Sequence, residues 1–284
     1  MAADPGGHAP GTVTGPVAAP TPAPAGAPAA VLREGPVGDS AVPRLELAEW
    51  AERYGVVAGV TTRGRGFSLG LWGDEPVGQV MTRWRALRTA FQPAFPALVL
   101  AHQVHGAALA WQRRATEGWL LLDGIDGHAT GTPGLLLTVT VADCIPVYLV
   151  APHKGVIALL HAGWRGTAAH ILERGVALLK GTAFARVQDI VMHCGVGICG
   201  SCYEVGSEVV AALGVAAPTT GATPAGPVRL DLRAVLVAQA QALGLTAISV
   251  SPWCSAHDRT QFFSHRASGG RDGRMVAYLG VPLA

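Results

Sequence analysis

Short apolar runs alternate with amphipathic stretches along most of the chain. The runs are rich in Val, Ile and Leu and are bounded by Gly, Pro or charged residues, which is typical of buried strands. We expect strands at residues 56–62, 97–104, 134–141, 145–150, 156–160, 190–193 and 247–250.

Three other stretches carry apolar residues at helical spacing, each after a residue that can cap a helix. We expect helices that follow Asp74, Thr167 and Asp231 and run to about Phe91, Lys180 and Leu243. Strands that alternate with helices predict an α/β fold, a layered sandwich of mixed β-sheets flanked by helices in a single domain.

The N-terminal segment differs from the rest. Residues 1–43 consist mainly of Ala, Pro, Gly and Thr with few large apolar side chains. Such a segment buries too little surface to offset the entropy lost on ordering, so we expect a disordered tail at 1–43 and one folded domain at 44–284. A second Ala/Pro-rich stretch at 216–227 is expected to be a surface loop.

Composition narrows the class of protein. Half of the 284 residues are hydrophobic, 14% are charged and the net charge is +2, which does not indicate a nucleic-acid groove. No signal peptide is visible, and Asp143 and Pro146 interrupt the longest apolar run, so no membrane span is expected. Five cysteines in such a chain point to reduced thiols and a cytoplasmic location. The sequence carries no signal of an oligomeric state.

Three segments place a potential metal ligand where a predicted strand ends. They contain His105 (QVHG), Cys144 (ADCIP) and His161 (HAGWRG). Two imidazoles and one thiolate suit Zn²⁺ and leave a fourth position for water or substrate, and such an ion lowers the pKa of bound water to about 7. Asp143, beside Cys144, is the expected acceptor that orients one imidazole. Two alternatives to a metal ligand remain for Cys144. It can be an ordinary buried core residue, or a nucleophile with His161 or His105 as its base.

These segments, in this order, resemble the hallmarks of the YfiH/laccase-domain family of purine nucleoside phosphorylases. The resemblance continues in 201–206 (SCYEVG), 230–232 (LDL), 262–266 (FFSHR) and 61–64 (TTRG), and covers about residues 55–280. Gly70 and His265 stand where the family has Asn and Tyr, which leaves the substrate preference open.

The resemblance implies a cysteine-hydrolase-like fold and a zinc held by His105, Cys144 and His161. It also implies phosphorolysis of adenosine, inosine, guanosine and methylthioadenosine, and deamination of adenosine. Purine nucleosides and inorganic phosphate would then be the partners. The catalytic residues would be Cys144, His161, His105 and Asp143.

Further residues in these segments suit such substrates. Arginines bind phosphate through paired hydrogen bonds, and we expect this of Arg63, Arg165, Arg266 and Arg274. Glu204 or Asp143 is the expected proton carrier in deamination. A purine can stack on Trp164, Tyr203 or Phe263.

A non-enzymatic partner module with a structural zinc stays open as an interpretation, and so do three others. The first is a metal-independent Cys–His hydrolase. The second is a copper-dependent polyphenol oxidase, although none of the ten histidines forms an H-x-H pair. The third is an iron–sulfur protein that uses Cys194, Cys199, Cys202 and Cys254.

Overall fold

The computed structural model describes residues 29–38, 41–113, 117–215 and 228–284. Two seven-stranded mixed sheets form its centre. The first has the order β1 (Ala30–Val31), β15 (Ala247–Val250), β12 (Val191–Cys194), β10 (Ile145–Ala151), β11 (Val156–Ala162), β8 (Gly127–Thr130), β6 (Leu109–Gln112). The second has the order β2 (Gly35–Pro36), β3 (Arg44–Glu46), β4 (Val57–Thr61), β16 (Met275–Gly280), β9 (Leu135–Val141), β5 (Ala97–His102), β7 (Gly118–Asp123).

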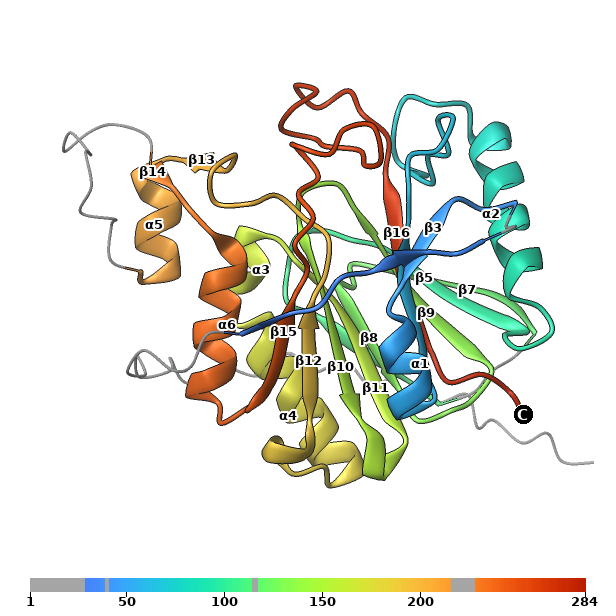
Figure 1. The fold of residues 1–284 in the computed structure, drawn as a ribbon, viewed down its shortest axis with the longest axis horizontal. Coiled ribbons are helices and arrows are strands. Elements are labelled where there is room, and N and C mark those ends of the chain that lie inside the picture. The colour runs from blue at the N-terminus through green and yellow to red at the C-terminus, as the bar shows by residue number, and fades with distance from the viewer. Residues whose placement is uncertain (1–28, 39–40, 114–116, 216–227) are drawn as a thin grey trace, which may run out of the picture.

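The helices cover the outer faces of the two sheets. On the first sheet lie α4 (Ile171–Ala183) and α6 (Leu232–Ala242), and on the second lies α2 (Val77–Phe91), on opposite sides of the molecule (Figure 1). The smaller elements are α1 (Ala48–Tyr54), α3 (Trp164–Ala168), α5 (Ser207–Leu213) and the ribbon of β13 (Glu204–Val205) and β14 (Val228–Arg229). The predicted α/β fold with mixed sheets is confirmed.

The strand sequences explain the layering. In β10, Val147 and Leu149 pack toward α4, whereas Tyr148 and Val150 face the second sheet. Because side chains alternate between the two faces of a strand, a strand covered on both faces must be apolar at every position. All seven residues of β10 and all seven of β11 are buried, which is why these runs stood out in the sequence.

Two of the three predicted helices begin at other residues than expected. Asp231 caps α6 by accepting from the backbone N–H groups of Arg233 and Ala234, as predicted. Asp74 does not cap α2, which begins at Val77. The predicted helix after Thr167 is two helices, because His170 adopts a left-handed φ of 61° and interrupts the hydrogen-bond ladder.

The boundary expected at residue 43 is wrong. Residues 29–38 are part of the folded domain, since β1 pairs with β15 and β2 pairs with β3. Glu34 is 1% exposed and accepts from Ser251 Oγ at 2.7 Å, and its other oxygen lies 3.1 Å from His193 Nε2. A segment poor in apolar residues is ordered here by strand pairing and a buried polar network. Residues 1–28 and the expected loop at 216–227 lie outside the described residues.

Within the described part of the chain, no helix has both the length and the apolar composition needed to cross a bilayer.

We predict that Glu34→Ala lowers the free energy of unfolding by about 1–3 kcal/mol, because His193 and Ser251 are buried and lose their shared acceptor. Denaturant unfolding measures this. Glu49→Ala is the control, since it removes only an ion pair with Arg53 that is exposed and screened by solvent. Equal effects of the two substitutions would contradict the packing of the 29–38 segment.

A buried histidine predicts an acid-sensitive step in stability. His128 is 1% exposed, neither ring nitrogen has a hydrogen-bond partner among the described residues, and burial lowers its pKa to about 4 despite the nearby Asp126 charge. Between pH 6.5 and 4 the unfolded chain binds the proton and the folded chain does not, so stability falls as the pH falls, by up to about 3 kcal/mol. We expect His128→Leu to flatten this slope in pH-dependent thermal unfolding. The same replacement at the exposed His153 should leave the slope intact.

Candidate active site and metal centre

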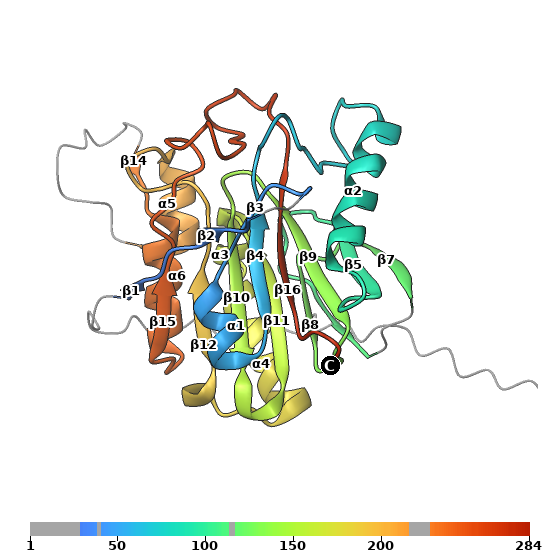
Figure 2. The same cartoon turned by 45° about the vertical axis from the view of Figure 1, so that its right-hand side comes forward.

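The loops that carry the sequence hallmarks gather at one end of the two sheets. His105 follows β5, Cys144 follows β9 and His161 is the penultimate residue of β11. The loop from β4 to α2 and the long loop from β15 to β16 lie side by side over the same end (Figures 1 and 2). Strand ends are where side chains leave the packed core and become available for chemistry.

The three expected ligands come together. One donor atom from each of His105, Cys144 and His161 lies within 4.8 Å of the other two, and the two imidazole rings are 4.9 Å apart between centroids. Gly163 permits this approach, since a Cβ there would lie 3.0 Å from Cys144 Sγ and 3.1 Å from His105 Cδ2. The donor set and its spacing fit a single metal ion bound by two nitrogens and one sulfur.

The buried Asp126 holds two of the three ligands in position. Its carboxylate is fully buried and accepts from the backbone N–H groups of Val104 (3.2 Å), His105 (3.0 Å) and Gly106 (2.7 Å). It also lies 2.9 Å from His161 Nδ1. Burial opposes the charge, but these hydrogen bonds outweigh it and lower the pKa of Asp126. With Nδ1 bound to Asp126, the Nε2 atom of His161 remains for a metal.

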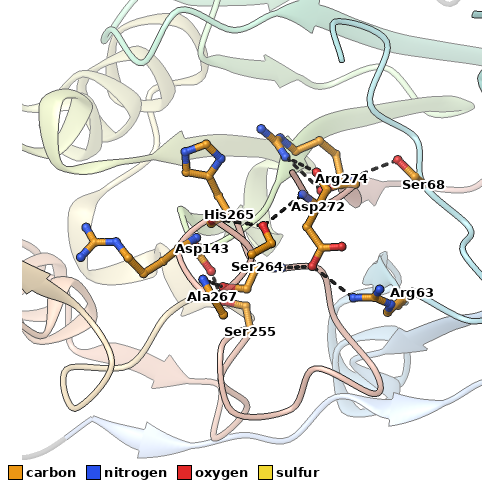
Figure 3. A network of polar contacts seen from close by, with 12 residues as sticks. Arg63, Ser68, Asp143, Ser255, Ser264, His265, Ala267, Asp272 and Arg274 are labelled. Carbon is orange, nitrogen blue, oxygen red and sulfur yellow. Dashed lines mark hydrogen bonds and ion pairs between the residues drawn. The ribbon is translucent and has the colours of Figure 1, made fainter. Parts of the chain in front are cut away.

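The role expected for Asp143 is therefore wrong in one respect. Asp143 does not contact either imidazole. One of its oxygens accepts from Ser255 Oγ at 2.6 Å (Figure 3). The other accepts from the backbone N–H of Arg266, also at 2.6 Å. Asp143 has a left-handed φ of 87° and joins the ligand loop to the β15–β16 loop. The sequence analysis did not identify Asp126. The one feature that could have indicated it is an acidic residue directly before the fully buried strand β8.

Cys144 and His161 also form a charge pair. Burial disfavours the thiolate, but the facing His161 and hydrogen bonds from both histidines outweigh it and lower the pKa of Cys144 to about 6. Burial disfavours the imidazolium as well, but the charges of Cys144 and Asp126 raise the pKa of His161 to about 9. The site thus stabilises the thiolate, the form in which cysteine binds metal or acts as a nucleophile.

A cleft of about 860 Å³ opens above the three ligands. The residues of the expected set that line it are Cys144, His161, His105, Asp143, Arg165, Arg266, Arg274, Trp164, Tyr203 and Phe263. Sequence reasoning missed the aromatic side chain of Trp72, which also lines the cleft and is half exposed. A volume of this order is typical of small-molecule sites.

Two residues expected to bind substrate lie elsewhere. Arg63 forms an ion pair with Asp272 at 3.1 Å (Figure 3). Its guanidinium group also lies over the Phe263 ring. The side chain of Glu204 is exposed outside the cleft, and only its backbone oxygen takes part, accepting from the Arg266 guanidinium. Both residues support the cleft wall and do not face its interior.

With this geometry in place, comparison with known proteins gives the family. The sequence model described as "Multi-copper polyphenol oxidoreductase laccase" matches residues 54–282, and the chain belongs to this family.

Relatives and solved structures agree with this placement. The purine nucleoside phosphorylase YlmD of Geobacillus stearothermophilus is 35% identical over 250 residues, which covers 80% of this chain and 90% of the relative. A purine nucleoside phosphorylase of Deinococcus radiodurans is 35% identical over 231 residues, covering 78% and 88%. The adenosine deaminase RL5 of an unknown prokaryotic organism is 36% identical over 167 residues, covering 54% and 61%.

Two crystal structures share the fold. YfiH of Bacillus licheniformis superposes with a TM-score of 0.76 at 27% identity, and YlmD of Geobacillus stearothermophilus with 0.75 at 32% identity. Each match covers 85% of this chain and 97% of the other. The predicted resemblance to the YfiH/laccase-domain family is confirmed.

We predict that Asp126→Asn weakens zinc binding at the three-ligand centre by about 10- to 100-fold, because the carboxylate orients His161 and fixes the backbone around His105. Competition with a chelator measures the affinity. Asp123→Asn is the matched control, since Asp123 pairs with His102, an imidazole outside the ligand set. Equal losses in both variants would contradict the role of Asp126.

Proposed function

We propose that this chain is a zinc-dependent purine nucleoside-processing enzyme. Its reactions would be phosphorolysis of adenosine, inosine, guanosine and methylthioadenosine, together with deamination of adenosine. The observation that carries the proposal is the cluster of His105, Cys144 and His161 beneath a cleft lined by arginines and aromatic rings. The names of the relatives, purine nucleoside phosphorylase and adenosine deaminase, support the same substrate class.

The donor set supports a catalytic ion over a structural one. Three protein ligands are the usual number in catalytic zinc sites, where the fourth position takes water or substrate, whereas structural sites use four. His105 is exposed and lines the cleft, whereas His161 is only 3% exposed. The centre is therefore accessible from the cleft and closed on the side of the sheets. When bound, zinc supplies a Lewis acid and lowers the pKa of bound water.

The cations of the cleft suit the phosphate that phosphorolysis requires. Arg165 and Arg266 are exposed within it, and each lies against an aromatic ring, Trp164 at 4.4 Å and Tyr203 at 5.2 Å. These contacts hold the guanidinium groups in place, and they leave N–H groups for an anion. Rings in the same walls offer flat apolar surface to a purine.

Of the two carboxylates expected to carry a proton in deamination, Asp143 lines the cleft and Glu204 does not. We assign this role to Asp143. Its two hydrogen bonds hold the carboxylate in one orientation beside Cys144.

A second function, a metal-independent Cys–His hydrolase, draws support from the thiolate–imidazolium pair of Cys144 and His161. Copper in place of zinc would fit the family description.

Elemental analysis of the wild-type protein and of Cys144→Ala, paired with assays of inosine plus phosphate and of adenosine, distinguishes these functions. We expect Cys144→Ala to contain about one zinc fewer per chain and to lose nucleoside turnover. Copper in that difference would favour the oxidase. An unchanged metal content with lost amide or ester hydrolysis would favour the Cys–His hydrolase.

We predict that Arg266→Ala raises the KM for phosphate in phosphorolysis by about 10- to 100-fold, since a hydrogen bond to a charged group is worth about 1.5–3 kcal/mol. Adenosine deamination needs no phosphate, so it should persist, and the backbone N–H that binds Asp143 remains in the variant. Steady-state kinetics of both reactions measure the effect, with Arg85→Ala on the exposed face of α2 as control. A parallel loss of both reactions would contradict a phosphate-binding role.

A further inference from the structure

A second group of metal-ligating side chains lies outside the three-ligand centre. Cys199 and Cys202 follow β12, and Cys254 and His257 follow β15. One donor atom from each of the four lies within 4.8 Å of all the others. The spacing is C-x2-C and then C-x2-H, so each loop offers two donors three residues apart.

The backbone brings the two loops together. Strands β12 and β15 are parallel neighbours, with Cys194 opposite Val250. The pairing continues beyond the strands, since Gly197 bridges Cys254 and the backbone N–H of Ser255 donates to Gly197 O at 3.0 Å. The two loops therefore leave the same end of the sheet side by side.

Each loop then makes a tight turn that aims its two donors the same way. In the first turn the backbone N–H of Cys202 donates to Cys199 O at 3.0 Å. In the second, Asp258 closes the turn twice: its N–H donates to Cys254 O, and its carboxylate accepts from the Cys254 N–H at 3.0 Å. Paired short turns of this kind are the usual carriers of zinc ligands.

The side chains are already in contact. Cys202 Sγ lies 3.0 Å from His257 Nε2, Cys199 Sγ lies 3.6 Å from His257 Nδ1, and the Cys199 N–H donates to Cys254 Sγ at 3.3 Å. Cys254 is 3% exposed and His257 is exposed, so the cluster lies at the surface with one ligand beneath it.

We propose that Cys199, Cys202, Cys254 and His257 form a second, structural zinc site that joins the two loops. Three thiolates and one imidazole make a closed tetrahedral set, in which sulfur atoms at about 2.3 Å from zinc lie about 3.8 Å apart. The present separations need only small adjustments to reach that geometry. This site is independent of the proposed nucleoside chemistry.

The geometry disfavours the iron–sulfur cluster considered from the sequence. Cys194, expected as one of its ligands, is fully buried in β12 within the hydrophobic core. The remaining donors are close enough to share one ion, whereas the four thiolates of an iron–sulfur cluster are divided among two or more irons and spread farther apart. Sequence reasoning overlooked His257, although its spacing from Cys254 repeats that of the cysteine pair.

An ion at this site would support the cleft. Tyr203, which lines the cleft, follows Cys202, and Ser255, which donates to Asp143, follows Cys254. The second zinc thus fixes both loops: the one that places Tyr203 in the cleft wall, and the one whose Ser255 hydroxyl orients Asp143.

The test uses the full-length Cys144→Ala protein, in which the first centre is disabled. Loaded with zinc alone, it should bind about one equivalent, and X-ray absorption should give about three sulfur and one nitrogen neighbours. Replacing zinc with cobalt(II) should give the visible bands of a tetrahedral thiolate site. Adding Cys199→Ser or, separately, the exposed His257→Ala should abolish this binding or weaken it at least tenfold.

Cys194→Ala in the same background is the matched control, since it removes a cysteine outside the cluster and should leave the equivalent of zinc in place. Absence of zinc from the Cys144→Ala protein under reducing conditions would overturn the proposal. Iron with acid-labile sulfide, or a Cys199–Cys202 disulfide that persists in reductant, would overturn it in favour of those alternatives. If both proteins bind zinc here but the wild type lacks nucleoside turnover, only the proposed function fails.

Discussion

The centre depends on one buried charge. The carboxylate of Asp126 is removed from water, and a buried carboxylate is stable only when its oxygens are fully hydrogen-bonded. Three consecutive backbone N–H groups and His161 supply those bonds. To present three N–H groups to one anion, the chain at His105 adopts a left-handed φ of 58°, a conformation that costs a non-glycine residue free energy. The same bend brings the His105 ring to within 4.9 Å of His161.

The sheets hold the other half of the centre. β10 and β11 are antiparallel neighbours with Ile145 opposite Ala162, so Cys144, directly before β10, and His161, near the end of β11, lie at the same end of the sheet. Both strands are buried on two faces, and a one-residue shift of register would move every side chain to the opposite face and break its packing. The position of Cys144 relative to His161 is therefore determined by core packing, whereas His105 depends on Asp126. A rigid base of this kind allows the surrounding loops to define the cleft.

The elements that could be predicted are those whose residues are buried on one or two continuous faces. β10, β11 and the Asp231-capped α6 were predicted for this reason. The packing of residues 29–38 could not, because it rests on edge pairing and on Glu34 meeting Ser251, 217 positions away. The three ligands were found through their short motifs. Asp126 was missed because its partners are mainly backbone groups, which carry no sequence signal, and the positions of Arg63 and Glu204 depend on loop conformation.

The two proposed metal sites would have different roles, one in chemistry and one in support of the fold. The first has three donors and faces the cleft, as a site that must exchange water and substrate requires. The second has four donors and no free position, so it can only hold loops together. The loop from β15 to β16 is long and lacks strands or helices, and it ends in β16 at the middle of the second sheet. Such a loop loses much conformational entropy on ordering, and contacts with the rest of the domain must offset this loss. The Ser255–Asp143 hydrogen bond and the Arg63–Asp272 ion pair restrain it at two points. The proposed zinc at Cys254 and His257 would add a third, so that the cleft wall keeps its shape beside Cys144.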